Sequence, residues 1–513
     1  MKITKTPIAA AIALVLMGTA AGAHAQSSDT AIAANDPAEA GATRSRDAKK
    51  LEQVVVSGIS ESLARSLEVK RDAASVIEVV TNEDIGKMPD KNVADSLQRV
   101  PGVTISSASA SEGGFDEADR VSLRGTNPSL TQTLIDGHMV GSGDWFVLNQ
   151  VGTVGRSVSY SLLPSELVSQ VVVHKSSQAD LVEGGVAGTV DIQTRRPLYM
   201  PTSFTALAEI GGVYADLPDT TDPQFNALVA WKNDAESVGI MLQGFREERH
   251  LRRDGQEMLG YGRIAPGSAI ATSNPDLSGV LFPNVIGSAL FEQERERTGG
   301  MVDIQVKPSD NWTLDLNAFT SKLDATNFNR NYLVWVTRLL DGGNGQAPSP
   351  GYVVRNGTLV SASFTPQPDR TGVVDDQIYR PGAESETKFV NLDGEWRVND
   401  RLTFTAEIGD SKGEGNTPTQ AVFEGDILNT GAAYRLNGTG RPADASVPNG
   451  NPAVFTGTTL DWIFGASPGS TDDEESWGKI DGAFALDHGA FTNFKFGFRA
   501  ANHDRSTVFV AQG

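Results

Sequence analysis

The C-terminal part of this chain alternates apolar and polar side chains with a period of two, and this pattern restricts its fold more than any other feature. In residues 301–307, aliphatic and polar side chains alternate without interruption: Val302, Asp303, Ile304, Gln305, Val306 and Lys307. The alternation recurs in residues 311–321, 390–398 and 402–408. It gives each β-strand one apolar and one polar face. A soluble sandwich would need a second sheet over the apolar faces, and the spacing of the segments is too uneven for that. We therefore expect an antiparallel transmembrane β-barrel with one face to lipid and one to the lumen.

This pattern predicts nine strands with unequal connections. The expected strands lie at about 204–214, 224–232, 236–246, 297–307, 311–322, 387–398, 401–410, 476–487 and 491–503. Tight turns are expected at Asn233-Asp234, residues 308–310, Asn399-Asp400 and His488-Gly489, and long polar loops at 247–296, 323–386 and 411–475. Short turns on the periplasmic side and long loops outside are typical of outer-membrane barrels.

The N-terminal end carries an export signal. Residues 1–25 combine Lys2 and Lys5, an apolar run and a small-x-small site at Ala23-His24-Ala25, which predicts a cleaved signal peptide. Residues 26–50 offer almost nothing to bury and are expected to form a disordered tail. No apolar run after residue 25 is long enough for a membrane-spanning helix.

Short, mixed segments follow, and they predict a compact α+β region. Residues 168–173 and 189–194 form a pair of expected strands, joined through a glycine turn at Gly184, Gly185 and Gly188. Helices are expected at about 62–70 and 92–100, the second ended by Pro101. Residues 51–58 form a short strand-former directly after the tail. This segment is either the first strand of the α+β region or an exposed segment that adds to a partner's sheet.

Composition and the absence of certain motifs argue against several kinds of function. The formal net charge of −21 argues against binding nucleic acid, and the chain has no cysteines. The six histidines are scattered, no serine-hydrolase elbow or phosphate loop is present, and we expect no catalytic site, metal site or cofactor. The run Asp472-Asp473-Glu474-Glu475 lacks the regular ligand spacing of a calcium site and predicts a solvated acidic loop.

Several strings resemble the plug domain of TonB-dependent outer-membrane receptors. They are EDIGKMPDKNVADSLQRVPGVTI, VSLRGTNPSLTQTLIDGHMV, RSVSY, LPSELV, ADLVEGGVAGTVDI and TRRP. The resemblance spans residues 51–198 and implies a plug domain at 59–198 followed by the N-terminal part of a barrel at 199–513. The family barrel has about 22 strands, so nine imply an incomplete, truncated receptor. The resemblance also identifies residues 51–58 as the TonB box, with Glu52, Gln53, Val54, Val55, Val56 and Ser57 as the partner-binding residues.

The resemblance implies a transporter in the outer membrane, with its plug and N-terminus on the periplasmic side, rather than an enzyme. Its implied partners are the TonB energy-coupling protein, outer-membrane lipid, the barrel-assembly machinery and a small ligand. The LPSELV and DIGKMPDKNVADSLQRVPGV variants look most like the subfamily linked to saccharide uptake. Siderophore receptors, a passive porin and a non-transporting receptor fragment remain alternatives.

Two small sets are candidate site residues. Asp144, Trp145 and Phe146 follow two glycines in an expected plug loop, and an aromatic face beside a carboxylate suits a sugar ring. Packing of the two aromatic side chains inside the plug or against the barrel wall is the alternative. Arg124 and Arg156 are expected to anchor the plug by pairing with carboxylates such as Asp136 or glutamates of the barrel wall.

Overall fold

The computed structural model describes residues 66–71, 73, 75–81, 92–107, 118–144, 155–341, 345–447, 458–464, 468–489 and 491–510. All of them belong to one compact unit, Glu61–Gly513. The expected signal peptide, tail and TonB box lie outside the described residues, as do Trp145 and Phe146.

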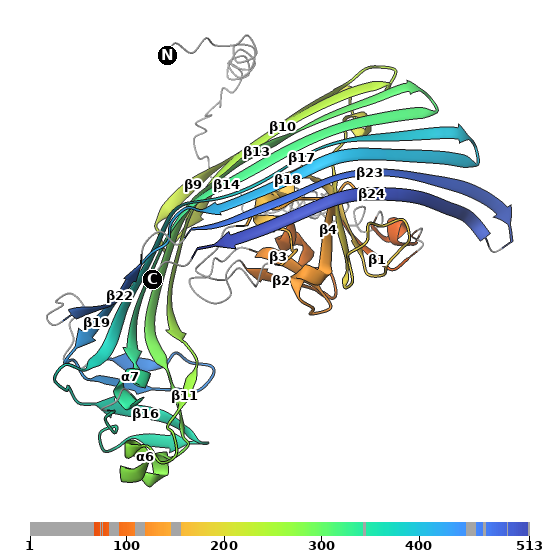
Figure 1. Ribbon diagram of the computed structural model, residues 1–513. Helices are drawn as coiled ribbons and strands as arrows, with labels where there is room; N and C mark the ends of the chain where they lie inside the picture. The colour runs from red at the N-terminus through yellow and green to blue at the C-terminus, as the bar shows by residue number, and fades with distance from the viewer. Residues whose placement is uncertain are drawn as a thin grey trace, which may run out of the picture. The chain divides into compact units, whose positions relative to one another are not determined.

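The first part of the described chain is an α+β domain built on a five-stranded sheet (Figure 1). The strand order is β1 (Ile77–Thr81), β6 (Val168–His174), β7 (Gly188–Thr194), β4 (Thr131–Ile135) and β5 (His138–Met139). The remaining elements are helix α4 (Val93–Leu97), the hairpin of β2 (Val103–Ser107) and β3 (Ala118–Leu123), and the short 3-10 turns η1 (Pro128–Leu130), η2 (Tyr160–Leu162), η3 (Ser165–Leu167) and η4 (Pro197–Tyr199).

Turn chemistry explains how these strands pair. The predicted pairing of residues 168–173 with 189–194 is confirmed as the antiparallel pair β6–β7. Gly188 has φ +143°, and a Cβ there would overlap the side chain of Leu123, so only glycine fits. Strands β4 and β5 are joined by Asp136-Gly137, both with positive φ, as a tight two-residue hairpin requires.

The domain's core is apolar and extends into the following sheet. Val93 and Leu97 of α4 are fully buried against the β-strands, and Asn92 caps the helix by accepting from the backbone N–H of Asp95. Phe319 and Phe389, which come from later strands, belong to the same apolar cluster. The α+β domain and the sheet therefore share one core.

The second part is an antiparallel meander in which each long strand pairs with the next (Figure 1). In order, its strands are β8 (Phe204–Ala215), β9 (Thr220–Lys232), β10 (Val238–Met258), β13 (Val285–Ser309), β14 (Trp312–Trp335), β17 (Thr371–Asn399), β18 (Leu402–Thr417), β23 (Gly469–His488) and β24 (Phe491–Phe509). Strands β19 (Ala421–Leu428) and β22 (Thr458–Phe464) extend it beside β17. The nine predicted strands and the fold class are confirmed. No helix among the described residues is both long and apolar enough to cross a membrane.

The prediction of long polar loops between these strands was wrong over much of its length. Strand β10 continues to Met258, β13 begins at Val285, and β14 runs on to Trp335. Where residues 247–250 pair with residues 294–297, polar side chains occupy both faces, so the apolar–polar contrast disappears although the backbone ladder continues. Cross-strand ion pairs take its place: Arg246–Glu296 at 2.9 Å and Lys412–Glu474 at 2.6 Å.

The strand ends opposite the tight turns carry a separate small sheet, here called the lobe. Its strands are β11 (Tyr261–Arg263), β12 (Leu281–Pro283), β15 (Val353–Arg355), β16 (Thr358–Phe364), β20 (Ala432–Arg435) and β21 (Asp444–Ser446). Helices α6 (Ala269–Ser273) and α7 (Val336–Asp341) and the turn η5 (Pro275–Leu277) complete it. Buried residues such as Leu277, Phe282, Leu359 and Tyr434 give the lobe its own core. These segments had been predicted as polar loops.

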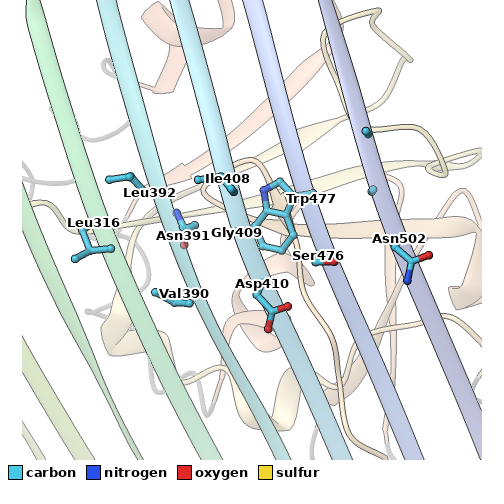
Figure 2. Close-up of a pocket in the computed structure, with 12 residues that line it drawn as sticks. Leu316, Val390, Asn391, Leu392, Ile408, Gly409, Asp410, Ser476, Trp477 and Asn502 are labelled. Carbon is cyan, nitrogen blue, oxygen red and sulfur yellow. The ribbon is translucent and has the colours of Figure 1, made fainter.

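Burial along the meander is inverted relative to a soluble protein. On the face away from the α+β domain, Leu316 is 41% and Ile408 62% exposed, whereas inward-facing Asp315 and Asn391 are 4% and 2% exposed. Figure 2 shows Leu316, Val390, Leu392 and Ile408 side by side on three neighbouring strands, around a shallow hollow of about 600 Å³. Both faces follow the predicted alternation, with the apolar face uncovered.

Candidate functional site

The candidate site is the contact between the α+β domain and the polar face of the sheet. Residues 141–144 leave β5 and lie across β17, β18 and β23. The backbone N–H of Gly141 donates to Ser411 Oγ at 2.8 Å, and that of Ser142 donates to Asp473 Oδ2 at 3.1 Å. Ser385 Oγ donates to the carbonyl oxygen of Gly143 at 2.7 Å. The segment is therefore bound through its main chain.

Glycine on both sides allows this close approach. A Cβ on Gly143 would overlap the carbonyl oxygen of Glu414, and a Cβ on Gly415 would overlap the backbone of Asp144. Gly413 likewise faces the backbone of Ser142. The alternating glycines of β18 lie on one face of the strand and form a track for residues 141–144.

Asp144 ends this segment as a charged residue buried in the contact. Its side chain is 0% exposed, and its two carboxylate oxygens pair separately with Arg120 of β3 and Arg505 of β24. Burial raises the pKa of Asp144 above its ordinary value, and the two guanidinium groups oppose that rise. Both oxygens serve the contact between the domain and the sheet, and a ligand role for Asp144, Trp145 and Phe146 stays a prediction.

The same network continues along the inner face of β23 and β24. Asp473 accepts from Arg505 at 2.7 Å and from His503 at 2.6 Å, and Glu475 lies 3.0 Å from His503 and also pairs with Arg499. Residues 472–475 therefore belong to a strand, and the prediction of a solvated acidic loop was wrong. Asp473 and Glu475 point inward and are each 3% exposed.

His138 forms a second charged contact. Its Nε2 lies 3.1 Å from Asp393 Oδ1 on β17, its Nδ1 lies 3.7 Å from Glu407 on β18, and its ring stacks on Trp477 with centroids 5.3 Å apart. Burial alone would lower the pKa of His138, but the hydrogen bond and the charges of Asp393 and Glu407 outweigh it and raise the pKa. Sequence reasoning missed this site because His138 and Asp393 are far apart in the chain.

A third contact lies at the end of the α+β domain. Arg196 pairs with Asp315 of β14, and the backbone N–H of Leu198 donates to Gln305 at 3.0 Å. Asp136 accepts from Thr194 Oγ1 at 2.6 Å and lies 3.8 Å from Arg196. On the domain's side, Thr194 and Arg196 belong to the TRRP string, Leu198 directly follows it, and Asp136 belongs to the Asp-Gly turn.

The predicted anchoring residues lie elsewhere. Arg124 is exposed and donates to the backbone carbonyl oxygen of Lys175, within the α+β domain, and Arg156 is also exposed. Among the described residues, Asp136 pairs with Arg196 rather than with Arg124. Within the described part of the chain, guanidinium contacts between the domain and the sheet include those of Arg196, Arg297 and Arg505. Within the described residues, no group of three or more acidic or histidine side chains is placed to hold a metal ion.

Comparison with known proteins finds a family model that matches much of the α+β domain. Residues 69–190 match the family model described as TonB-dependent Receptor Plug Domain. Much of the α+β domain therefore matches a TonB-dependent receptor plug, and the domain is called the plug from here on. The plug carries Asp144 and His138, so two of the charged contacts connect a recognised plug with the polar face of the sheet.

The relatives are longer than the region they share with this chain. The vitamin B12 transporter BtuB of Photobacterium profundum is 29% identical over 143 residues, which are 28% of this chain and 21% of that protein. A mutant of the ferric enterobactin receptor PfeA of Pseudomonas aeruginosa aligns at 12% identity and TM-score 0.36, covering 86% of this chain and 60% of that one. The siderophore receptor PirA of Acinetobacter baumannii aligns at 11% identity and TM-score 0.29, covering 86% and 78%.

Proposed function

We propose that this chain belongs to an outer-membrane receptor that takes up a ligand with energy supplied through TonB. The observation that carries the proposal is the combination of a plug with a sheet whose apolar face is uncovered. An apolar face of this extent is stable against lipid and costly against water. The polar face is covered by the plug, so a solute passing along it must displace or rearrange the plug.

The aromatic side chains support this placement. Trp312 stacks on Trp396 at 5.2 Å, Trp396 lies 6.2 Å from Phe404, and Phe404 lies 6.1 Å from Phe496. These four side chains sit near the tight turns on the outer face of β14, β17, β18 and β24, and the last two meet across Gly482 of β23. Such a band is typical of both membrane–water interfaces of outer-membrane barrels, and short turns beside it are typical of the periplasmic one.

Energy coupling follows from the location. The outer membrane has no supply of nucleotides, so rearrangement of the plug needs a partner that transmits force. Residues 51–58, at the front of the plug, have the composition of a strand that adds to another sheet. We propose that Glu52, Gln53, Val54, Val55, Val56 and Ser57 bind TonB.

The ligand we propose is an oligosaccharide, with a siderophore as the alternative. The saccharide proposal derives from the motif variants in the plug, and the siderophore alternative derives from relatives such as the ferric enterobactin receptor. A receptor that binds its ligand without transporting it is a further alternative.

Deletion of residues 51–58 tests the proposal. Energy-dependent uptake of a labelled oligosaccharide mixture or ferric siderophore should be lost, whereas binding to whole cells should persist. Deletion of eight residues within 26–50 is the matched control and should leave uptake intact. Unchanged uptake in the 51–58 deletion would reject TonB coupling.

A further inference from the structure

The lobe differs in charge from the rest of the chain. Its three connecting segments, residues 259–284, 336–370 and 429–450, contain six arginines, four aspartates and neither lysine nor glutamate, a formal charge of +2. The whole chain carries −21, so the remainder carries −23. A cationic surface on an acidic protein attracts anions and orients them before they bind.

Strand register brings three of these arginines to one face. Arg263 lies opposite Leu281, Leu281 pairs with Thr358, and Thr358 lies opposite Arg355. Asn356-Gly357, both with positive φ, forms the tight hairpin turn that sets Arg355 against Thr358.

The third arginine is Arg435 of β20, opposite Ser361 of β16. Ser361 also lies opposite Val353, because β16 carries a bulge there, and Val353 is two residues from Arg355 on β15. Directly opposed residues, and residues two apart along a strand, point to the same side of a sheet, so Arg263, Arg355 and Arg435 share one face, here called the arginine face. All three side chains are exposed.

The arginine face is rigid and its cations are available. Leu359, Ala362 and Tyr434 point to the opposite side, into the lobe's core, and Tyr434 Oη donates to the carbonyl oxygen of Leu359 at 2.9 Å. Within the described part of the chain, no ion pair joins Arg263, Arg355 or Arg435 to a carboxylate. The nearest counter-charge by register is Asp444, opposite Arg435. Arg263 donates only to the backbone oxygen of Gly279.

We propose that the arginine face binds an acidic oligosaccharide whose sugar units carry carboxylates. Arg263 and Arg355 are three strand spacings apart, roughly 14 Å, and Arg435 is offset by three residues along the neighbouring strand. An extended polyanion reaches all three sites, whereas a compact anion reaches one. Guanidinium forks pair with planar carboxylates in two-point contacts. Tyr261 and Val353, exposed at 49% and 37%, offer apolar surface to the sugar rings.

This inference rests on the proposed receptor function and specifies its ligand class. Binding on the lobe needs no energy, so it is measured on the purified full chain in detergent. Calorimetric titration should detect a galacturonate hexamer and should detect neither maltohexaose nor citrate at the same concentrations. Raising the salt concentration should weaken the hexamer's binding, because exposed charges are screened.

Substitutions distinguish binding at the arginine face from a general effect of the protein's charge. Arg263→Gln, Arg355→Gln and Arg435→Gln should each weaken hexamer binding roughly two- to fivefold, and the triple variant by about tenfold or more. Arg397→Gln, at the far end of β17 and also exposed, removes the same charge and should change nothing. Circular dichroism of each variant verifies folding.

Three results would overturn the inference: a triple variant that binds like the parent, equal binding of maltohexaose, or full displacement of the hexamer by equimolar citrate. The deletion of residues 51–58 should bind the hexamer normally. Binding without uptake in cells would therefore reject the transport function and keep the arginine face. Uptake that does not depend on the three arginines would reject binding at the arginine face and keep the transport function.

Discussion

At the scale of single residues, the contact between plug and sheet depends on small side chains and buried charges in combination. Gly141, Gly143, Gly413 and Gly415 let two backbones approach, and the approach buries Asp144 between two arginines. A buried carboxylate is stable only when its hydrogen-bonding capacity is met, so the glycines and the ion pairs depend on each other.

Gly143→Val should loosen this contact. The added side chain would overlap the carbonyl oxygen of Glu414, a backbone atom that cannot move aside without displacing β18. We expect a loss of about 1–3 kcal/mol in the free energy of unfolding of the plug–sheet contact. Limited proteolysis of the membrane-embedded protein should then release plug fragments sooner.

Gly255→Val is the matched control, because a Cβ at Gly255 has no atom within 4 Å. Equal protease resistance of the parent and Gly143→Val would contradict the glycine track.

His138 should make the contact dependent on pH. Its pKa in the folded protein is raised above the value in the unfolded chain, because Asp393 and Glu407 favour the charged ring despite its burial. The stabilisation is therefore complete below about pH 6.5, the ordinary histidine pKa, and is lost as the pH rises through the folded-state pKa. Asp136 also faces the ring and acts in the same direction.

Thermal unfolding of parent and His138→Gln, measured from pH 5.5 to 9, tests this dependence. The parent should exceed the variant by about 1–3 kcal/mol at the acid end, and the difference should shrink as the pH rises. A difference that stays constant across this range would show that the ring acts by packing on Trp477 alone.

At the scale of elements, sequence alternation was sufficient to find every strand of the meander and insufficient to find where each ends. Contrast between faces exists only where one face meets lipid, as at Leu314 and Leu316. Beyond that zone, Lys322 and Glu384 form an ion pair across two strands on the outer face. Where the side chains of both faces are polar, the sequence predicts a loop instead of a strand. The Asn356-Gly357 pair is a local signal for a hairpin of the lobe, and this signal is independent of apolar–polar alternation.

The candidate site was less predictable for the same physical reason. Asp144 stood out beside its glycines, but its partner Arg505 lies 361 positions away. Arg124, Arg156 and Arg196 all lie in strings that resemble a plug domain, but of these three it is Arg196 that the structure pairs with a carboxylate of the sheet. A single sequence reveals which residues carry charge but does not reveal which of them tertiary contacts bring together.

Leu316→Arg should disturb the membrane insertion of strand β14 rather than the contact between plug and sheet. Leu316 is on the outer face of β14, between Trp312 near the tight turn and the charged Lys322, and arginine on the lipid face near the bilayer midplane costs about 2–4 kcal/mol. The fraction of protein that resists extraction from membranes by urea should fall. Thr320→Arg, two outward positions further along β14 beside Lys388, is the control and should insert normally. Equal insertion of both variants would contradict the assignment of the apolar face to lipid.

At the scale of the whole molecule, the chain joins two surfaces with opposite requirements. The outer face exposes Leu, Ile and Trp and is stable only in an apolar surrounding. The inner face carries Asp, Asn and Arg, which need hydrogen-bonding or charged partners. The plug supplies partners at three contacts of this face, where Asp144 pairs with Arg505, His138 with Asp393 and Arg196 with Asp315. Removal of either part would leave several carboxylates and guanidinium groups without partners.

A cross-link tests whether the plug occupies the inner face in the membrane. Asp180 of the plug pairs with Lys495 of β24 at 2.6 Å, and the chain has no native cysteines to interfere. The double variant Asp180→Cys/Lys495→Cys should form an intramolecular disulfide on mild oxidation of intact membranes, seen as a reducible shift in gel mobility. Asp180→Cys/Phe498→Cys places the second thiol on the lipid-facing side of the same strand, where Phe498 is 73% exposed, and should form little. Equal yields from the two pairs would mean that the plug does not occupy this face.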